Sequence, residues 1–124
     1  MIESLNKKVD LVEEGTSFLG FSDYGKLMIG DKAFEFYADQ SQKNYIQIPW
    51  TEIDKVIISV IFNRWIPRFA IKTKKNGMYT FAARDVKKVL RAIREYIPPE
   101  RMVKSLSAWQ VLKRNITYLI KKKK

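Results

Sequence analysis

The side chains that carry out most enzyme chemistry are missing from this chain of 124 residues, which contains neither histidine nor cysteine. Their absence excludes a Ser-His-Asp triad, a thiolate nucleophile, a phosphohistidine and a zinc site of the ordinary kind. The remaining candidates for acid–base work are carboxylate pairs, either Glu13 with Glu14 or Asp10 with Asp54. Nothing in the sequence brings either pair into a cleft, and there is no Gly-rich phosphate loop or dinucleotide fingerprint. We therefore expect a protein that is not an enzyme and uses no metal or cofactor.

Positive charge gathers at the C-terminal end of the chain. The whole sequence has 24 Lys and Arg against 13 Asp and Glu, a net charge of +11. Residues 101–124 hold eight basic residues and no acidic one, whereas residues 1–100 are nearly balanced. Such a segment predicts contact with an anionic lipid surface, a nucleic acid or an acidic protein face. The alternative is a tail that only aids solubility.

Apolar residues recur with helical spacing through the same basic segment, which predicts an amphipathic helix from about Ser105 to Ile120. A helix of this kind can lie in a membrane interface or in the groove of a partner protein. The alternative is that its apolar stripe packs back on the protein's own sheet. The expected partner- or membrane-binding residues are Arg101, Lys104, Trp109, Leu112, Lys113, Arg114, Ile116, Lys121 and Lys122.

A second candidate site is an expected loop in which two arginines flank a tryptophan, namely Arg64, Trp65 and Arg68. Guanidinium groups match phosphate bidentately, so this loop is a possible anion-binding site. The alternative is that Trp65 closes the end of the sheet while both arginines are solvated.

A third cluster of basic residues surrounds the expected turn at Asn76-Gly77 and the start of the helix that follows. Its position beside Tyr79 and Phe81 would allow phosphate contacts and base stacking. There is no RNP-type motif, helix-turn-helix pattern or zinc spacing, so nucleic acid is not the favoured partner. Lysines can instead protect a sheet edge from association. The cluster comprises Lys72, Lys74, Lys75, Arg84, Lys87, Lys88 and Arg91.

Alternating apolar residues predict a series of short strands joined by turns. Glu13-Glu14-Gly15 is interpreted as a turn or bulge within the first extended segment, and Gly30-Asp31 and Asn76-Gly77 as hairpin turns. Asp85 is a suitable N-cap for an amphipathic helix that runs to Ile97, where Pro98-Pro99 stops it.

These elements predict an α+β fold. We expect a bent antiparallel sheet of the pleckstrin-homology/GRAM-like kind, capped by an amphipathic helix, plus a basic C-terminal helix. The corresponding division is a folded domain over residues 1–99 and a helix with a lysine tail over residues 100–124.

Four blocks of the sequence, Gly25–Tyr37, Tyr45–Asp54, Trp65–Gly77 and Lys87–Pro99, resemble the ManO-like family. These are small Firmicute proteins of uncharacterised mechanism that are encoded beside mannose-class sugar phosphotransferase (PTS) transporters. The resemblance covers about Val9 to Arg114. Separately, the stretch from Ile48-Pro49-Trp50 to Val56 looks like a GRAM/pleckstrin-homology signature.

The resemblance implies a role beside the transporter, and the lack of histidine excludes phosphate relay on histidine. We expect an accessory protein that docks on the transporter's membrane subunits and modulates sugar uptake. The alternatives are a nucleic-acid-binding regulator of the transporter operon and a homo-oligomeric scaffold. The chain opens without an apolar signal core, and its longest apolar run, Val56–Phe62, is too short to span a bilayer. We expect a cytoplasmic protein at the inner membrane face.

Overall fold

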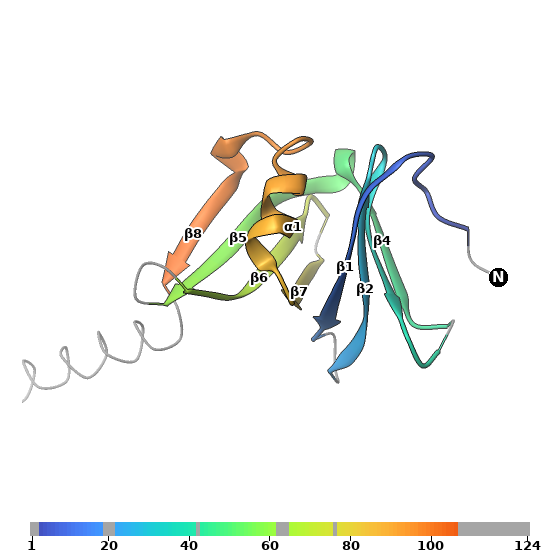
Figure 1. Ribbon diagram of the computed structural model, residues 1–124. Helices are drawn as coiled ribbons and strands as arrows, with labels where there is room; N and C mark the ends of the chain where they lie inside the picture. The colour runs from blue at the N-terminus through green and yellow to red at the C-terminus, as the bar shows by residue number, and fades with distance from the viewer. Residues whose placement is uncertain (1–2, 19–21, 42, 62–64, 76, 107–124) are drawn as a thin grey trace, which may run out of the picture.

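The computed structural model describes residues 3–18, 22–41, 43–61, 65–75 and 77–106 (Figure 1). Within these residues one sheet of eight strands has the order β4-β3-β2-β1-β7-β6-β5-β8. Neighbouring strands are antiparallel except β5 and β8, which are parallel. The elements are β1 (Val9–Ser17), β2 (Asp23–Gly30), β3 (Ala33–Ala38), β4 (Tyr45–Pro49), the 3₁₀ turn η1 (Trp50–Glu52), β5 (Ile53–Ile61), β6 (Trp65–Thr73), β7 (Met78–Ala83), α1 (Val86–Ile93), the 3₁₀ turn η2 (Pro99–Arg101) and β8 (Met102–Leu106).

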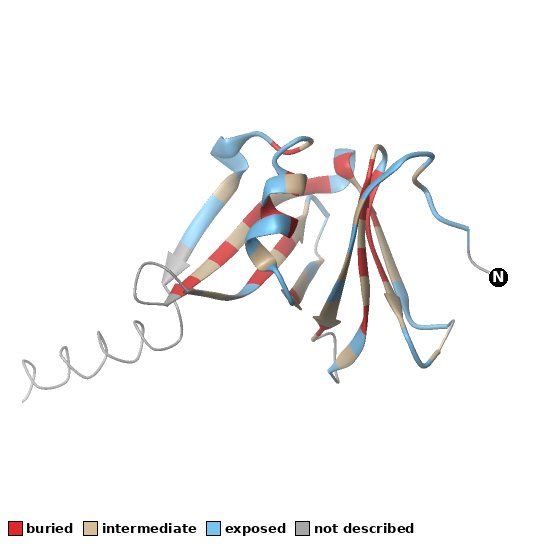
Figure 2. Ribbon diagram, viewed as in Figure 1, coloured by how far each residue is buried: buried red, intermediate tan, exposed pale blue. Residues whose placement is uncertain are grey.

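The sheet bends so that its two halves enclose a common core. In Figure 1 strands β1 to β4 form one side and β5 to β8 the other, with α1 between them. Buried residues alternate along the strands, so one face of each is turned inward (Figure 2). Phe34, Phe69 and Phe81 are fully buried at the centre, and the ring centroids of Phe34 and Phe81 are 4.9 Å apart. This aromatic cluster joins the two halves of the sheet.

The helix α1 begins where its cap was predicted. The Asp85 side chain accepts a hydrogen bond from the backbone N–H of Lys88 at 3.2 Å, and Val89, Leu90 and Ile93 are buried in the core. The helix ends at Ile93 and not at the predicted Ile97, because the chain then tightens: the backbone N–H groups of Glu95 and Tyr96 donate to carbonyls only three residues back, those of Ala92 and Ile93. The apolar stripe was therefore predicted correctly, but its last turn was not.

The predicted fold class is wrong in two respects. The sheet is mixed, because β8 adds to β5 in parallel, and the described residues contain a single α-helix. The helix expected from Ser105 is not present at its first two residues, since Ser105 and Leu106 complete β8. After Pro98 and Pro99 the chain returns along the free edge of β5, where Met102 pairs with Val56. Backbone hydrogen bonds at that edge outweigh the helical spacing that begins at Leu106.

The described residues include no helix that is both long enough and apolar enough to cross a membrane.

Candidate docking groove

Only part of the predicted partner-binding surface falls within the described residues. Arg101 lies in η2 and Lys104 in β8, and both are exposed. The other seven predicted residues, Trp109, Leu112, Lys113, Arg114, Ile116, Lys121 and Lys122, lie outside the described part of the chain. The proposed role of this C-terminal segment therefore stays a prediction.

The predicted anion-binding loop is only partly described. Arg64 lies outside the described residues, and Trp65 is the first residue of β6. The Arg68 guanidinium lies 4.2 Å from the centroid of the Phe18 ring, a cation–π arrangement. Arg68 is thus engaged with an aromatic side chain of its own chain.

Two of the carboxylates considered for acid–base chemistry, Asp10 and Asp54, are engaged with different partners. Asp10 accepts a hydrogen bond from the Tyr96 hydroxyl, and Asp54 lies 3.7 Å from the Lys72 ammonium. The hydrogen bond to Asp10 raises the pKa of Tyr96 to about 12. No group of three or more metal-ligating side chains occurs among the residues that the structure describes.

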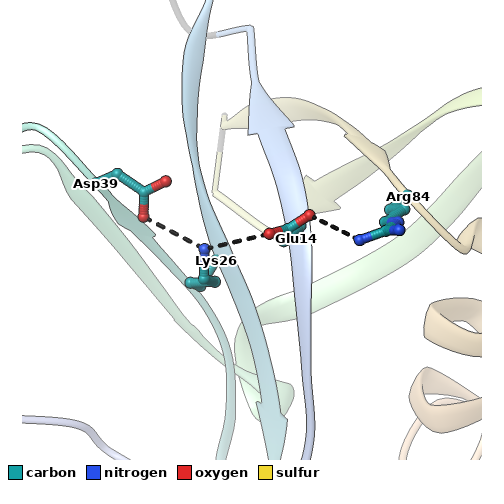
Figure 3. Close-up of polar contacts among 4 residues, drawn as sticks. All are labelled: Glu14, Lys26, Asp39 and Arg84. Atoms are coloured by element: carbon teal, nitrogen blue, oxygen red, sulfur yellow. Dashed lines mark hydrogen bonds and ion pairs between the residues drawn. The ribbon is translucent and has the colours of Figure 1, made fainter.

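Glu14 belongs to a chain of ion pairs that crosses the sheet (Figure 3). Its carboxylate lies 3.9 Å from Lys26 and 3.3 Å from Arg84, and Lys26 in turn lies 3.6 Å from Asp39. All four side chains are largely exposed, so each pair contributes little to stability. The arrangement balances two acidic against two basic groups and leaves no excess charge at this place.

Glu35 is fully buried, but it is saturated with hydrogen bonds. Its carboxylate accepts from the Ser4 hydroxyl, the Leu5 N–H at 2.8 Å, the Asn6 amide at 2.9 Å and the Tyr37 hydroxyl at 2.8 Å. Burial is the main cause that raises the pKa of Tyr37. The cluster fastens the segment before β1 against β3.

A groove of about 520 Å³ lies between α1 and the β5–β8 edge of the sheet. Its floor is apolar, formed by Ile58, Leu90 and Met102 with Pro99 at one end. Ile58 and Leu90 are members of the buried core, and Met102 packs against it. The floor is therefore held by the packing of the whole domain and is preformed.

One wall of the groove is a row of cations on α1 and its C-cap, namely Lys87, Arg91 and Arg94. Spacings of four and three residues place them on one face of the helix, and all three are exposed. None of the ion pairs among the described residues involves any of the three. In contrast to the network of Figure 3, these three cations have no acidic side chain within ion-pair distance in the part of the chain that the structure describes.

The strand β8 places one of the predicted residues on the groove side of the sheet. Lys104 pairs in register with Ile58, and register partners in a sheet point to the same face. Since Ile58 lines the groove, Lys104 lies on the groove side of the sheet. The predicted Lys104 is thus on the same side of the sheet as the groove, although it is not one of the residues that line it.

Lys87 and Arg91 belong to the basic cluster that was considered for nucleic-acid binding, whereas Arg94 was not predicted as a site residue. The spacing of the three cations was visible in the sequence. The groove itself was not, because its other wall exists only once β8 has paired with β5.

Comparison with solved structures shows a shared fold. Sixteen chains match, among them the C-terminal domain of an unknown protein from Leishmania infantum, with a TM-score of 0.64 and 14% sequence identity. The match covers 72% of this chain and 83% of that domain. At this identity the likeness shows the fold alone. No curated protein matches the sequence.

One family description matches almost the whole chain, over residues 1–116. The chain therefore belongs to the family described as Domain of unknown function (DUF956).

Proposed function

We propose that this chain is a non-enzymatic accessory protein that binds the cytoplasmic face of a mannose-class PTS transporter and modulates sugar uptake. The link to the transporter rests on the resemblance of four sequence blocks to the ManO-like family. The proposal of binding, without catalysis, rests on the absence of histidine and cysteine from the sequence and on the engagement of Asp10 and Asp54 with different partners.

The observation that carries the proposal is the groove between α1 and β8. It joins an apolar floor to a row of cations that no described acidic side chain neutralises. Docking sites on proteins commonly combine a desolvated apolar centre with a charged rim that guides association. A surface of the transporter's membrane subunits that presents both apolar and acidic side chains would satisfy both parts.

The C-terminal segment has a supporting role in this proposal. Trp109, Leu112 and Ile116 would supply apolar contacts with the transporter or the lipid surface. Arg101, Lys104, Lys113, Arg114, Lys121 and Lys122 would be attracted to anionic lipid, at about 1 kcal/mol per basic residue close to the membrane.

Co-sedimentation with inverted membrane vesicles tests the proposal. Membranes from cells with and without the mannose-class transporter are compared at about 50 mM and about 500 mM salt, because the higher salt screens charges beyond a few ångströms. We expect transporter-dependent sedimentation that persists at high salt. Sedimentation that is equal with and without the transporter and is lost at high salt would contradict the proposed function.

The same preparation tests the alternative of a nucleic-acid-binding regulator. Stronger retention on one operator sequence than on unrelated DNA, together with no transporter-dependent sedimentation, would replace the accessory role with the regulatory one.

A further inference from the structure

The three cations beside the groove lie in a row along one face of α1. Lys87 and Arg94 are seven residues apart, which corresponds to about 10 Å along the axis of α1. A single phosphate is bound by donors that all reach its oxygens within about 3 Å. A row of this length instead suits several carboxylates spaced along one segment.

The floor of the groove requires apolar groups from the same ligand. Leu90 is 6% and Ile58 9% exposed, and both belong to the core that continues beneath them. A volume of about 520 Å³ lies within the range of ligand pockets, which is about 300–1,000 Å³. An occupant that presents apolar side chains on one side and carboxylates on the neighbouring side matches both the floor and the row of cations.

The charge of the chain itself argues against its own C-terminal segment as the occupant. Residues 107–124 contain six basic residues and no acidic one, so they would be repelled by the row on α1. The nearby acidic residues are Asp85, Glu95 and Glu100, and none of them forms an ion pair among the described residues. The carboxylates must come from another molecule.

We propose that the groove between α1 and β8 receives an acidic amphipathic helix of a partner protein, whose apolar side chains cover Ile58, Leu90 and Met102 while its Asp and Glu residues pair with Lys87, Arg91 and Arg94. This is recognition of a helix in a groove, with anchors spaced three and four residues apart. The inference rests on the proposed function in that the partner is a segment of the transporter, and it adds the chemistry of that segment.

The test uses the full chain and a fluorescent synthetic peptide of about 18 residues, five helical turns, with leucine on one stripe and glutamate on the adjacent stripe. A peptide of the same composition in scrambled order is the control ligand. Fluorescence anisotropy is measured for both peptides at low and high salt. We expect binding of the amphipathic peptide at least tenfold tighter than that of the scrambled peptide.

The charge-reversed variant Lys87→Glu, Arg91→Glu, Arg94→Glu should weaken binding at least tenfold. The matched control Lys7→Glu, Lys43→Glu, Lys75→Glu changes the net charge equally at exposed positions that do not line the groove, and it should stay within twofold of the wild type. Equal loss in both variants would overturn the proposal, since it would show attraction by net charge only.

Met102→Lys tests the floor and keeps the cation row. Because Met102 is partly exposed on an edge strand, its replacement should leave the fold intact, as circular dichroism and thermal unfolding will verify. We expect this variant to lose at least tenfold in affinity, and unchanged affinity in a folded variant would overturn docking in the groove.

A parallel measurement uses vesicles of phosphatidylglycerol without protein. Tight binding to these vesicles with no preference for the amphipathic peptide would overturn the proposal in favour of lipid. If the peptide fails while transporter-dependent sedimentation is observed, the accessory function stands and the inferred occupant is wrong. If the peptide binds but sedimentation is equal with and without the transporter, the groove does bind an acidic amphipathic helix and the transporter is not the partner that supplies it.

Discussion

The indole of Trp50 and the phenol ring of Tyr96 stack face to face, with ring centroids 4.9 Å apart and ring planes 9° from parallel. Each ring is also fixed by a hydrogen bond at its polar end. Trp50 Nε1–H donates to the Gly30 carbonyl at 2.8 Å, and the Tyr96 hydroxyl donates to the carboxylate of Asp10. The stack therefore ties the segment after α1 to η1 and to both β1 and β2. It sets the direction in which the chain leaves α1 towards η2 and β8.

Replacing Trp50 should cause a large loss of stability. Its side chain is 9% exposed, so Trp50→Ala leaves a cavity and is expected to lower the free energy of unfolding by about 3–5 kcal/mol. Trp50→Phe keeps a ring for the stack but removes the hydrogen bond to the Gly30 carbonyl, which costs about 0.5–1.5 kcal/mol. Urea unfolding measures both changes, with Tyr45→Ala at an exposed position as the control. A loss below 1 kcal/mol for Trp50→Ala would contradict this role.

The Tyr96 hydroxyl should make the free energy of unfolding depend on pH in the alkaline range. The hydrogen bond to Asp10 raises its pKa from 10.0 to about 12 in the folded protein. Between these values the unfolded chain releases the phenol proton while the folded protein retains it, so this contribution to stability is full below pH 10 and is lost as the pH rises towards 12. Tyr96→Phe should cost less than about 1 kcal/mol at neutral pH, because the pair is exposed.

The measurement is the difference in free energy of unfolding between the wild type and Tyr96→Phe across pH 8 to 12. The difference should shrink above pH 10. A constant difference over the whole range would show that the hydroxyl is not held by Asp10.

Gly25 should not tolerate a side chain. It pairs with Gly15 on β1 and with Ala38 on β3, and an added Cβ would lie 2.1 Å from the carbonyl oxygen of Tyr37. That oxygen is part of the backbone, so the strand itself must shift. We expect Gly25→Ala to lower stability by about 1–3 kcal/mol, measured by urea unfolding. The control Tyr24→Ala, at a neighbouring position that is 71% exposed, should change stability by less than about 0.5 kcal/mol. Equal stability of the two variants would contradict the close approach.

The hairpin at Asn76-Gly77, the N-cap of α1 and the buried face of that helix could be predicted from residue types alone. Lys72 pairs with Met78 across the predicted Asn76-Gly77 turn, and Asp85 caps α1, because both signals act over a few residues. The prediction of a turn or bulge at Gly15 was wrong, because Gly15 lies inside β1 and pairs in regular register with Gly25. A glycine that is needed for close approach of strands has the same signal as one in a turn, until the neighbouring strand is known.

The path of residues 102–106 could not be predicted for a different reason. Val103 and its neighbours form β8 because they meet the open edge of β5, which is more than 40 residues earlier in the sequence. Local spacing favoured a helix starting at Ser105, and the long-range pairing overrode it. The groove depends on this pairing, so only its cation row was accessible to sequence analysis.

The position of β8 also determines where the chain can be shortened. A deletion after Leu106 removes six basic residues but keeps β8 paired with β5, whereas a cut after Pro99 would remove a strand of the sheet. We expect the deletion after Leu106 to leave the urea unfolding midpoint within error and to weaken membrane sedimentation several-fold at low salt. Unchanged sedimentation at low salt would exclude the C-terminal segment from membrane association.

The most direct test of the central claim is quantitative sedimentation with transporter-containing membranes at high salt. Three full-length proteins are compared: the wild type, the variant with Lys87, Arg91 and Arg94 changed to glutamate, and the variant with Lys7, Lys43 and Lys75 changed to glutamate. If the groove docks on the transporter, the first variant loses transporter-dependent sedimentation at least tenfold while the second matches the wild type. If both variants sediment like the wild type, the groove is not the docking site and the account is contradicted.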